Sequence, residues 1–442
     1  MASLRSSPAG AGEAGPEAQR LRSPFAPLRH RNYRLFWAGQ LVSVTGSWVQ
    51  SVAQGWLIAR LADPSGTHGE AAAGWYLGLV GAAGTLPVLF GALFGGVVAD
   101  RVEKRRLIMA TQAVMMLCAF TLAALTFTHV VRIWHVMALA ACLGTATAFD
   151  LPARQAFVVE MVGREDLSGA VALNSSLFNA ARMVGPAITG ALMAARVSLS
   201  VCFLLNGLSF LAVIFGLRQM VLPPTERVQM DDNVLSTIME GIGYARHNRS
   251  VRRILTFVAA FGTFAFSFNV LLPAFVRYYI VPGLPEGIQG RSYGLIESVR
   301  GVGALAGALT MASLARGGQQ RKMLVAGAIG SSIGLVAFSL TRSVLSAYVV
   351  IMLVAYCFVC CFASCQTLIQ MEVPNELRGR VMSLYVLLFT GLTPIGSLTA
   401  GSLARHYDAP TAMRAGVYIS LVILAVAALA ELRHLAMRKR FE

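Results

Sequence analysis

Charged side chains are scarce in this sequence. Asp, Glu, Lys and Arg make up 13% of the 442 residues, whereas soluble domains carry about 25%. Hydrophobic residues make up 56%, and the mean hydropathy is +0.63. This composition excludes a soluble globular protein. It predicts an all-α membrane protein, because a helix satisfies its own backbone polar groups in lipid.

Acidic residues are the scarcer of the two charge types, with 21 Asp and Glu against 37 Lys and Arg. The net charge of +16 is compatible with nucleic-acid binding, but most basic residues lie in the short segments expected on one side of a membrane. Cytoplasmic loops retain Lys and Arg in this way. The sequence therefore predicts contact with the lipid bilayer and its anionic head groups, and no nucleic-acid partner.

Clusters of metal-binding or nucleophilic residues are missing as well. The seven cysteines all lie in apolar runs, and none has a histidine at zinc-site spacing. The seven histidines are scattered, and no Gly-x-x-x-x-Gly-Lys-Ser/Thr phosphate-binding loop is present. These observations argue against an enzyme, a metal site, a cofactor and an ATP-driven pump.

Long apolar segments, by contrast, fill the chain. Twelve of them are long enough to cross a bilayer as helices of roughly 20 residues. Six lie in an N-terminal half, 34–219, and six in a C-terminal half, 253–433. A polar linker with a short amphipathic helix, 220–252, joins the halves. The flanking segments, 1–33 and 434–442, are expected to be cytoplasmic tails, the first of them disordered.

The two halves repeat one another. Gly307-Ala-Leu309 follows Gly91-Ala-Leu93 by 216 positions, and Gly396 follows Gly185 by 211. Duplicated halves of this kind surround a central cavity in secondary transporters. The sequence therefore predicts two pseudo-symmetric six-helix bundles that open a shared cavity to one side of the membrane at a time.

A basic turn joins the second and third apolar segments. It contains Gly96, then Asp100, then Arg101, Arg105 and Arg106. So short and basic a turn between two apolar helices marks the cytoplasmic face. We expect Asp100 and the arginines to form a latch that gates the cavity and is stable in one state only.

The same turn resembles motif A of the major facilitator superfamily, except that Glu103 replaces a glycine. Three stretches narrow the resemblance: Leu28–Trp37, Ala153–Glu160 and Ala172–Pro186. Together they resemble the branch that contains the bacterial enterobactin exporter and the macrolide efflux transporters. The resemblance implies the fold of that superfamily and the export of siderophores, drugs or other amphiphiles in exchange for protons. We accordingly expect a monomer in the bacterial cytoplasmic (inner) membrane, with both termini in the cytoplasm.

Gly185, Pro186 and Gly190 are similar to the fifth-span antiporter motif of that superfamily, in shortened form. Small residues let helices approach closely in lipid, so we expect these three to pack against a neighbouring helix. The arginine that many proton antiporters carry in the fourth span corresponds to Ala141 here. That position therefore does not supply a coupling charge.

Charged residues within the apolar segments are candidates for transport, because a charge at membrane depth is costly. Arg182 lies near the middle of the fifth segment, with Asn174 two turns away. Glu297 and Arg300 are one turn apart in the eighth segment, where a buried carboxylate suits proton exchange. Substrate or proton coupling by these residues and a purely structural pairing both stay open.

Other polar and aromatic residues are candidates for the cavity and its rim. Asp150 and Arg154 are one turn apart and are expected to pair at the inner rim, either as a gate or to handle protons or substrate. The first segment has a polar face, and the seventh has a phenylalanine stripe that either lines the cavity or packs in lipid and protein. The cavity-lining candidates are Gln40, Ser47, Ser51, Gln54, Phe264 and Phe268.

Three functions remain open at this point. The first is a twelve-span secondary exporter of an amphiphilic small molecule, such as a siderophore or a drug, driven by the proton gradient and needing no cofactor. The second is an uptake carrier of the same fold for a nutrient or metabolite. The third is a non-transporting membrane sensor or a membrane enzyme, which the lack of a sizeable soluble domain and of clustered reactive residues disfavours.

Overall fold

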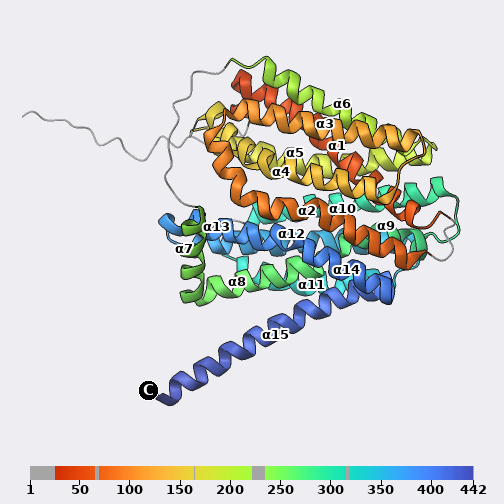
Figure 1. The fold of residues 1–442 in the computed structure, drawn as a ribbon. Helices are drawn as coiled ribbons and strands as arrows, with labels where there is room; N and C mark the ends of the chain where they lie inside the picture. Colours follow the sequence, from red (N-terminus) through yellow and green to blue (C-terminus); the bar gives the residue numbers. More distant parts are fainter. Residues whose placement is uncertain (1–24, 65–68, 164, 222–233, 315–317, 442) are drawn as a thin grey trace, which may run out of the picture.

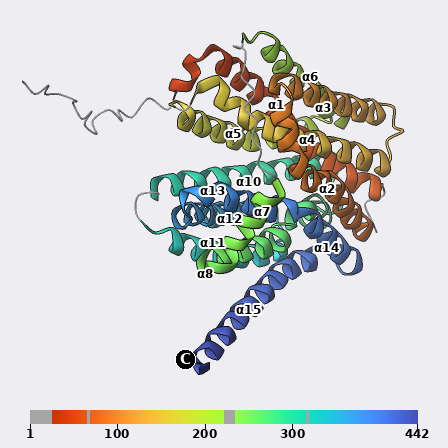
Figure 2. The same ribbon diagram turned by 60° about the vertical axis from the view of Figure 1, so that its left-hand side comes forward.

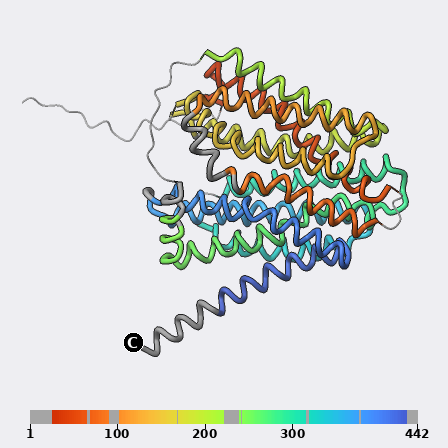
Figure 3. Tube along the Cα trace, in the orientation of Figure 1, coloured from red at the N-terminus to blue at the C-terminus, as the bar shows by residue number. Residues whose placement is uncertain are grey.

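The computed structural model describes residues 25–64, 69–163, 165–221, 234–314 and 318–441, and this part of the chain contains helices and no strands (Figures 1 and 3). Within it, a few helical residues are described by their backbone alone: 90, 92–101, 168, 234–238, 241, 375, 376 and 430–441. Backbone hydrogen bonds are thus satisfied within each helix, as a lipid environment requires.

Six long helices form the N-terminal half, after a short 3-10 turn at Ala26–Arg29. They are α1 (Arg31–Ala62), α2 (Glu70–Arg101), α3 (Lys104–Phe127), α4 (Ile133–Val162), α5 (Leu167–Ala194) and α6 (Leu199–Arg218). Their connections are short, so consecutive helices run antiparallel. Gly163 ends α4 with φ of +68°, a backbone conformation that favours glycine.

The linker contains the amphipathic helix that the sequence predicts, α7 (Val234–His247). The C-terminal half then crosses the molecule six more times, and π-helical turns interrupt two of the crossings. The elements are α8 (Arg249–Ala260), η2 (Phe261–Ala265), α9 (Phe268–Phe275), η3 (Val276–Ile280), α10 (Glu286–Leu314), α11 (Gln320–Leu340), α12 (Val344–Glu372), α13 (Asn375–Val386), η4 (Leu387–Gly391), α14 (Thr393–His406) and α15 (Ala409–Phe441). A π-turn redirects the side chains that follow it.

Ten helical segments among the described residues are long and apolar enough to cross a membrane, judged by length and composition. α1 and α5 are too polar to meet that criterion, but they are 32 and 28 residues long and pack among the others. Together these helices give the described chain twelve crossings in two groups of six, as predicted. Most of α1–α6 lies in the upper part of Figures 1 and 2 and most of the C-terminal half below it, with α2 and α10 at a similar level between them.

The two ends of the molecule differ in how the halves meet. We call the end where α1, α3 and α5 begin the basic end, since it carries Lys104, Arg105 and Arg106, and we call the other the opposite end. Between the halves, α5 packs against α10 and α2 against α14. A Cβ atom added at Gly294 would lie 2.4 Å from Gly190 Cα. Only glycine allows backbones to approach so closely.

Hydrophobic packing between the halves also differs between the two ends of the molecule. The largest buried cluster contains residues of both halves, among them Trp56 and Leu77 from one and Leu271 and Tyr293 from the other. A second cluster, which includes Tyr33, belongs to the N-terminal half alone and lies at its basic end. The halves are therefore packed together at the opposite end.

Replacing Gly294 with Leu should separate α5 from α10, because even its Cβ would collide with Gly190. Met193, which touches Gly290 across this contact, is buried. In a cysteine-free background, we expect a Met193→Cys probe to react several-fold faster with a maleimide when Gly294→Leu is present. Gly379→Leu is the control, since a Cβ there meets nothing within 4 Å. Equal labelling rates in both variants would contradict this account of the contact.

Candidate functional site

A buried ion pair lies on α10, at the level where α10 meets α5. Arg300 pairs with Glu297 one turn away, and its Nη1 donates a hydrogen bond to Asn269 Oδ1 on α9. Glu297 and Arg300 are 5% and 7% exposed. A buried charge pair of this kind persists only when further hydrogen bonds satisfy it, which is the part that Asn269 plays.

Asn269 was not predicted from the sequence. It lies between Phe268 and Val270, and a single amide in so apolar a run is the signal that could have identified it. Its own Nδ2 donates to the carbonyl oxygen of Phe266, at 2.6 Å, which holds the amide in place. Asn269 thus connects the seventh crossing to the charges of the eighth.

Arg182 approaches this pair from the other half. A Cβ atom added at Gly301, next to Arg300, would lie 2.9 Å from the Arg182 carbonyl oxygen, and the charge of Arg182 interacts with those of Arg300 and Glu297. Its guanidinium carbon lies 5.6 Å from the centre of the Trp48 ring, a cation–π contact. The Nε atoms of Arg182 and Arg300 are buried without a hydrogen-bond partner among the described residues.

Arg182 and the Glu297–Arg300 pair therefore lie on facing helices, α5 and α10, where the halves join. The structure brings Arg182, Glu297 and Arg300 together, but it places Asn174 elsewhere. Asn174 Oδ1 accepts a hydrogen bond of 3.2 Å from the Tyr33 hydroxyl, nearer the basic end. The surplus positive charge at membrane depth makes this group of three the strongest candidate for substrate or proton handling.

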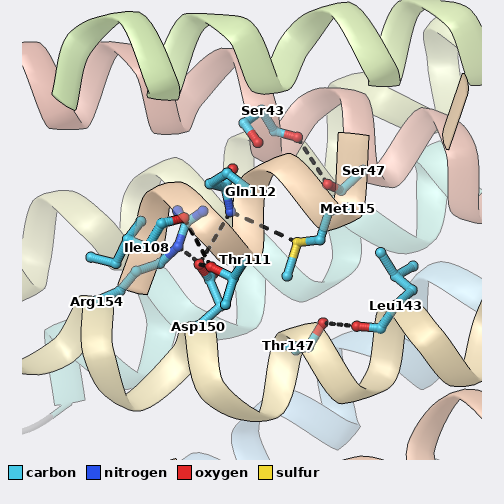
Figure 4. A network of polar contacts seen from close by, with 10 residues as sticks. All are labelled: Ser43, Ser47, Ile108, Thr111, Gln112, Met115, Leu143, Thr147, Asp150 and Arg154. Carbon is cyan, nitrogen blue, oxygen red and sulfur yellow. Dashed lines mark hydrogen bonds and ion pairs between the residues drawn. The ribbon is translucent and has the colours of Figure 1, made fainter. Parts of the chain in front are cut away.

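The second charge pair, Asp150 with Arg154, lies within the N-terminal half and is completed by α3 (Figure 4). Asp150 Oδ1 accepts hydrogen bonds from Thr111 Oγ1 at 2.7 Å and Gln112 Nε2 at 3.2 Å, while Oδ2 pairs with Arg154. Asp150 is 6% exposed. Thr111 and Gln112 were not predicted, although two adjacent polar residues in an apolar helix were a visible signal. The network clamps α4 to α3.

The predicted latch is described only in part. Gly96, Asp100 and Arg101 lie outside the residues whose side chains the structure describes. Arg105 and Arg106 are described, and both bond within the N-terminal half. Since the carboxylate of the motif is not among the described side chains, a latch between the halves stays a prediction.

Arg105 and its neighbours hold the basic end of the N-terminal half together. Arg105 donates to the carbonyl oxygens of Arg218 and Met220, at 3.0 and 3.3 Å, and so caps the end of α6. Arg106 pairs with Glu103 at 2.6 Å on the surface, which gives the residue that departs from the family pattern a partner within the turn.

Hydrogen bonds between the halves close the opposite end. Asp63 Oδ2 accepts from the Tyr278 hydroxyl at 2.9 Å, and the Asp63 carbonyl oxygen accepts from Arg277 Nη2 at 2.8 Å. Both Glu70 carboxylate oxygens accept from the Tyr279 hydroxyl at 2.8 Å. We call Asp63, Glu70 and these three partners the opposite-end gate. No local pattern in the sequence predicts the opposite-end gate, because its hydrogen-bonded partners are more than 200 positions apart.

Glu70 also contacts a helix terminus of the other half. Its Oε1 accepts from the backbone N–H of Ala409 at 2.8 Å, at the start of α15. A carboxylate is favourable there because the first N–H groups of a helix are unpaired and its dipole is positive. Both acidic residues of the opposite-end gate therefore bind donors from the C-terminal half.

The predicted cavity-lining residues divide into two groups. Ser47 and Ser51 are exposed on α1, and Gln54 and Phe264 are partly exposed. Gln40 and Phe268 are instead buried, at 2% and 3% exposure. Phe268 stacks on Phe358 with ring centres 6.0 Å apart, and so packs inside the C-terminal half rather than lining an open surface.

The glycine–proline motif of α5 lies between two neighbouring helices. A Cβ at Gly185 would lie 2.5 Å from Trp48 Cβ on α1, and a Cβ at Gly294 of α10 would lie 2.9 Å from the Pro186 carbonyl oxygen. Gly190 meets Gly294 one turn further along. The motif thus packs one face of α5 against α1 of the same half and the opposite face against α10 of the C-terminal half.

The sequence profile of a family described as transmembrane secretion effectors matches residues 22–440. The chain belongs to this family of major facilitator superfamily transporters. It is therefore a multi-pass transmembrane transporter that moves a small molecule, and not an enzyme.

Curated relatives of this transporter share its length at low identity. It is 22% identical to the staphyloferrin A transporter of Staphylococcus aureus over 83% of this chain and 87% of that one. It is 24% identical to the multidrug efflux pump Tap of Mycolicibacterium fortuitum (82% and 87% covered), and 25% identical to macrolide efflux protein A of Streptococcus pyogenes (85% and 91%).

Solved structures agree on the fold. The nucleoside transporter NupG superposes with a TM-score of 0.66 at 15% identity, covering 88% of this chain and 98% of that one. A D-xylose–proton symporter superposes with a TM-score of 0.65 at 14% identity, covering 90% and 96%. At such identities the likeness concerns the fold alone.

The double substitution Asp63→Asn/Glu70→Gln should weaken the opposite-end gate, because it removes the charge from both acceptors. Hydrogen bonds to a charged group contribute about 1.5–3 kcal/mol each. The transporter should shift at least tenfold toward a state open at that end. Spin labels at Ala195 and Leu284, exposed on either half, would report longer distances. Glu160→Gln is the control, since Glu160 pairs with Lys104 within one half at the basic end. An unchanged distance distribution would argue against the gate.

Asp150→Ala should destabilise the transporter by roughly 3 kcal/mol, because it removes the buried acceptor of Thr111 and Gln112 and leaves the part-buried Arg154 without its partner. Reversible unfolding in mixed micelles measures the change. Glu103→Ala removes the exposed pair with Arg106 and should cost about 1 kcal/mol or less. Equal losses in the two variants would mean that the Asp150 network does not clamp α3 to α4.

Proposed function

We propose that this transporter is a secondary exporter of an amphiphilic small molecule, siderophore-like or drug-like, which it exchanges for protons. The observation that carries the proposal is the Glu297–Arg300 pair, buried where α10 meets α5 of the other half. The names of the relatives, a staphyloferrin A transporter and efflux proteins for drugs and macrolides, support the substrate class.

Glu297 can couple protons to substrate by competition. As a carboxylate it pairs with Arg300 and can accept a hydrogen bond from a substrate hydroxyl or amine. Protonation removes the ion pair with Arg300 and the negative charge that attracts a cationic substrate group, so a proton and the substrate compete for this carboxylate. Competition at one site that faces each side in turn produces antiport.

Protonation of Glu297 also changes the contact between the halves. Neutral Glu297 no longer offsets the charges of Arg300 and Arg182, which then repel each other across the α5–α10 contact. The halves are packed together at the opposite end, and repulsion at mid-depth favours their separation. Protonation of Glu297 therefore promotes separation of the halves at the opposite end, which the ionised Glu297–Arg300 pair resists.

The charge distribution supports an orientation of the transporter in the membrane. The basic end, with Lys104, Arg105 and Arg106, faces the cytoplasm by the positive-inside rule, and both termini lie there in the inner membrane. Packing at the opposite end then corresponds to a state open to the cytoplasm, in which an exporter loads. The exposed Ser47 and Ser51 on α1 line the loading path. The transporter acts as a monomer.

In proteoliposomes, an imposed pH gradient should drive movement of a siderophore or a macrolide by the wild type. Glu297→Gln should abolish this effect of the gradient on transport. The variant should retain a weaker substrate exchange without a gradient, because the Gln carbonyl oxygen still accepts a hydrogen bond although the charge for which protons compete is gone. Glu240→Gln, at a surface pair with Arg380 away from the contact between the halves, should leave transport unchanged.

Two results would contradict the proposal. A full response to the pH gradient in Glu297→Gln would remove Glu297 from proton coupling. Failure of the wild type to move any member of a panel of siderophores and lipophilic drugs under a pH gradient would count against proton-driven export.

A further inference from the structure

A groove on the C-terminal half lies away from the charges described above. It has a volume of about 410 Å³, within the roughly 300–1,000 Å³ of small-molecule sites. α7 and α8 form one wall, and the crossing α13–η4–α14 with α15 forms the other. All lining residues belong to α7 or to the C-terminal half, so the groove is not part of the contact between the halves.

The body of the groove is apolar. Its walls include Leu255, Ala259, Phe264, Leu388 and Leu392, and Ile423 of α15 closes one side. None of the lining residues that the structure describes is acidic. A surface of this kind in a membrane-spanning half suits a hydrocarbon chain, whose burial is favourable in proportion to its apolar area.

The basic end of the groove carries positive charge. Arg246 and Arg252 line it, and the exposed Arg249 and Arg253 lie nearby at the start of α8. Arg252 Nη1 donates to the Arg246 carbonyl oxygen at 2.7 Å, which fixes the two arginines relative to each other. Asn248 stabilises the turn between α7 and α8.

Asn248 caps the N-terminus of α8. Its side-chain oxygen accepts hydrogen bonds from the backbone N–H groups of Ser250 and Val251, at 3.0 and 3.1 Å. Such a cap orders the first turn of α8. The guanidinium groups at the mouth of the groove are therefore presented from a rigid turn.

The length of the groove matches one leaflet of a bilayer. Arg252 and Thr263 line its two ends along α8 and η2, eleven residues apart, which corresponds to about 16 Å at 1.5 Å per residue. Half of a hydrocarbon core of about 30 Å is about 15 Å. A lipid whose head group binds the arginines would thus extend an acyl chain along the whole groove.

We propose that the groove binds one anionic phospholipid from the leaflet at the basic end. Its phosphate lies between Arg246 and Arg252, and one acyl chain lies along α8 toward Phe264. Because the groove is bounded by the linker helix, the eleventh crossing and the twelfth, the bound lipid holds α7 against the C-terminal half. The site is independent of the transport reaction proposed above.

Native mass spectrometry of the purified full-length transporter tests the proposal with phosphatidylglycerol and phosphatidylcholine of identical acyl chains. We expect a preference for phosphatidylglycerol that falls about tenfold in Arg246→Ala/Arg252→Ala, since each arginine near a membrane surface attracts anionic lipid. Arg246→Lys/Arg252→Lys should keep the preference, which separates loss of charge from misfolding.

The matched control is Arg29→Ala/Arg34→Ala, two exposed arginines of the N-terminal half at the same end, which should retain the preference. Ala259→Trp, which fills the groove, should reduce binding of phosphatidylglycerol. Equal binding of the two lipids, or equal losses in the two alanine pairs, would overturn the proposal. Displacement of phosphatidylglycerol by a macrolide would also overturn it, by assigning the groove to a substrate.

Discussion

Glu297 can be buried at membrane depth only because Arg300 lies one turn away and Asn269 holds the other side of the guanidinium. This interaction ties the seventh crossing to the eighth. Arg182 of the other half adds a third charge across the α5–α10 contact. This placement is why we propose that protonation of a single carboxylate acts both on the packing within one half and on the contact between the halves.

The other buried carboxylate shows why position matters more than burial. Asp150 is as well buried as Glu297, but three donors from α3 and α4 satisfy it within one half. Such a group rigidifies a bundle. Glu297 lies beside surplus positive charge where the two halves meet, and we therefore propose that its ionisation affects their relative motion. The opposite-end gate, at Asp63 and Glu70, and the glycine contact of α5 with α10 then define one resting arrangement of the halves.

Hydropathy, spacing and charge in the sequence determined the architecture. Apolar runs separated by short turns predict helices that cross a bilayer, and their number and duplication predict two halves. The pairs Asp150–Arg154 and Glu297–Arg300 were also predictable, since residues three or four apart share a helix face. The amphipathic linker helix followed for the same reason. Each of these features depends on residues close together in the chain.

Tertiary structure decided the partners and the exposure of the site residues. Asn174 pairs with Tyr33 rather than approaching Arg182, and Asn269 completes the charge pair. Gln40 and Phe268 are buried while Ser47 and Ser51 are exposed, so a polar or aromatic face did not by itself identify the open surface. These outcomes depend on how each helix is rotated about its axis and on which distant helix packs against it. Helix periodicity places residues on a common face, but only packing decides what that face meets.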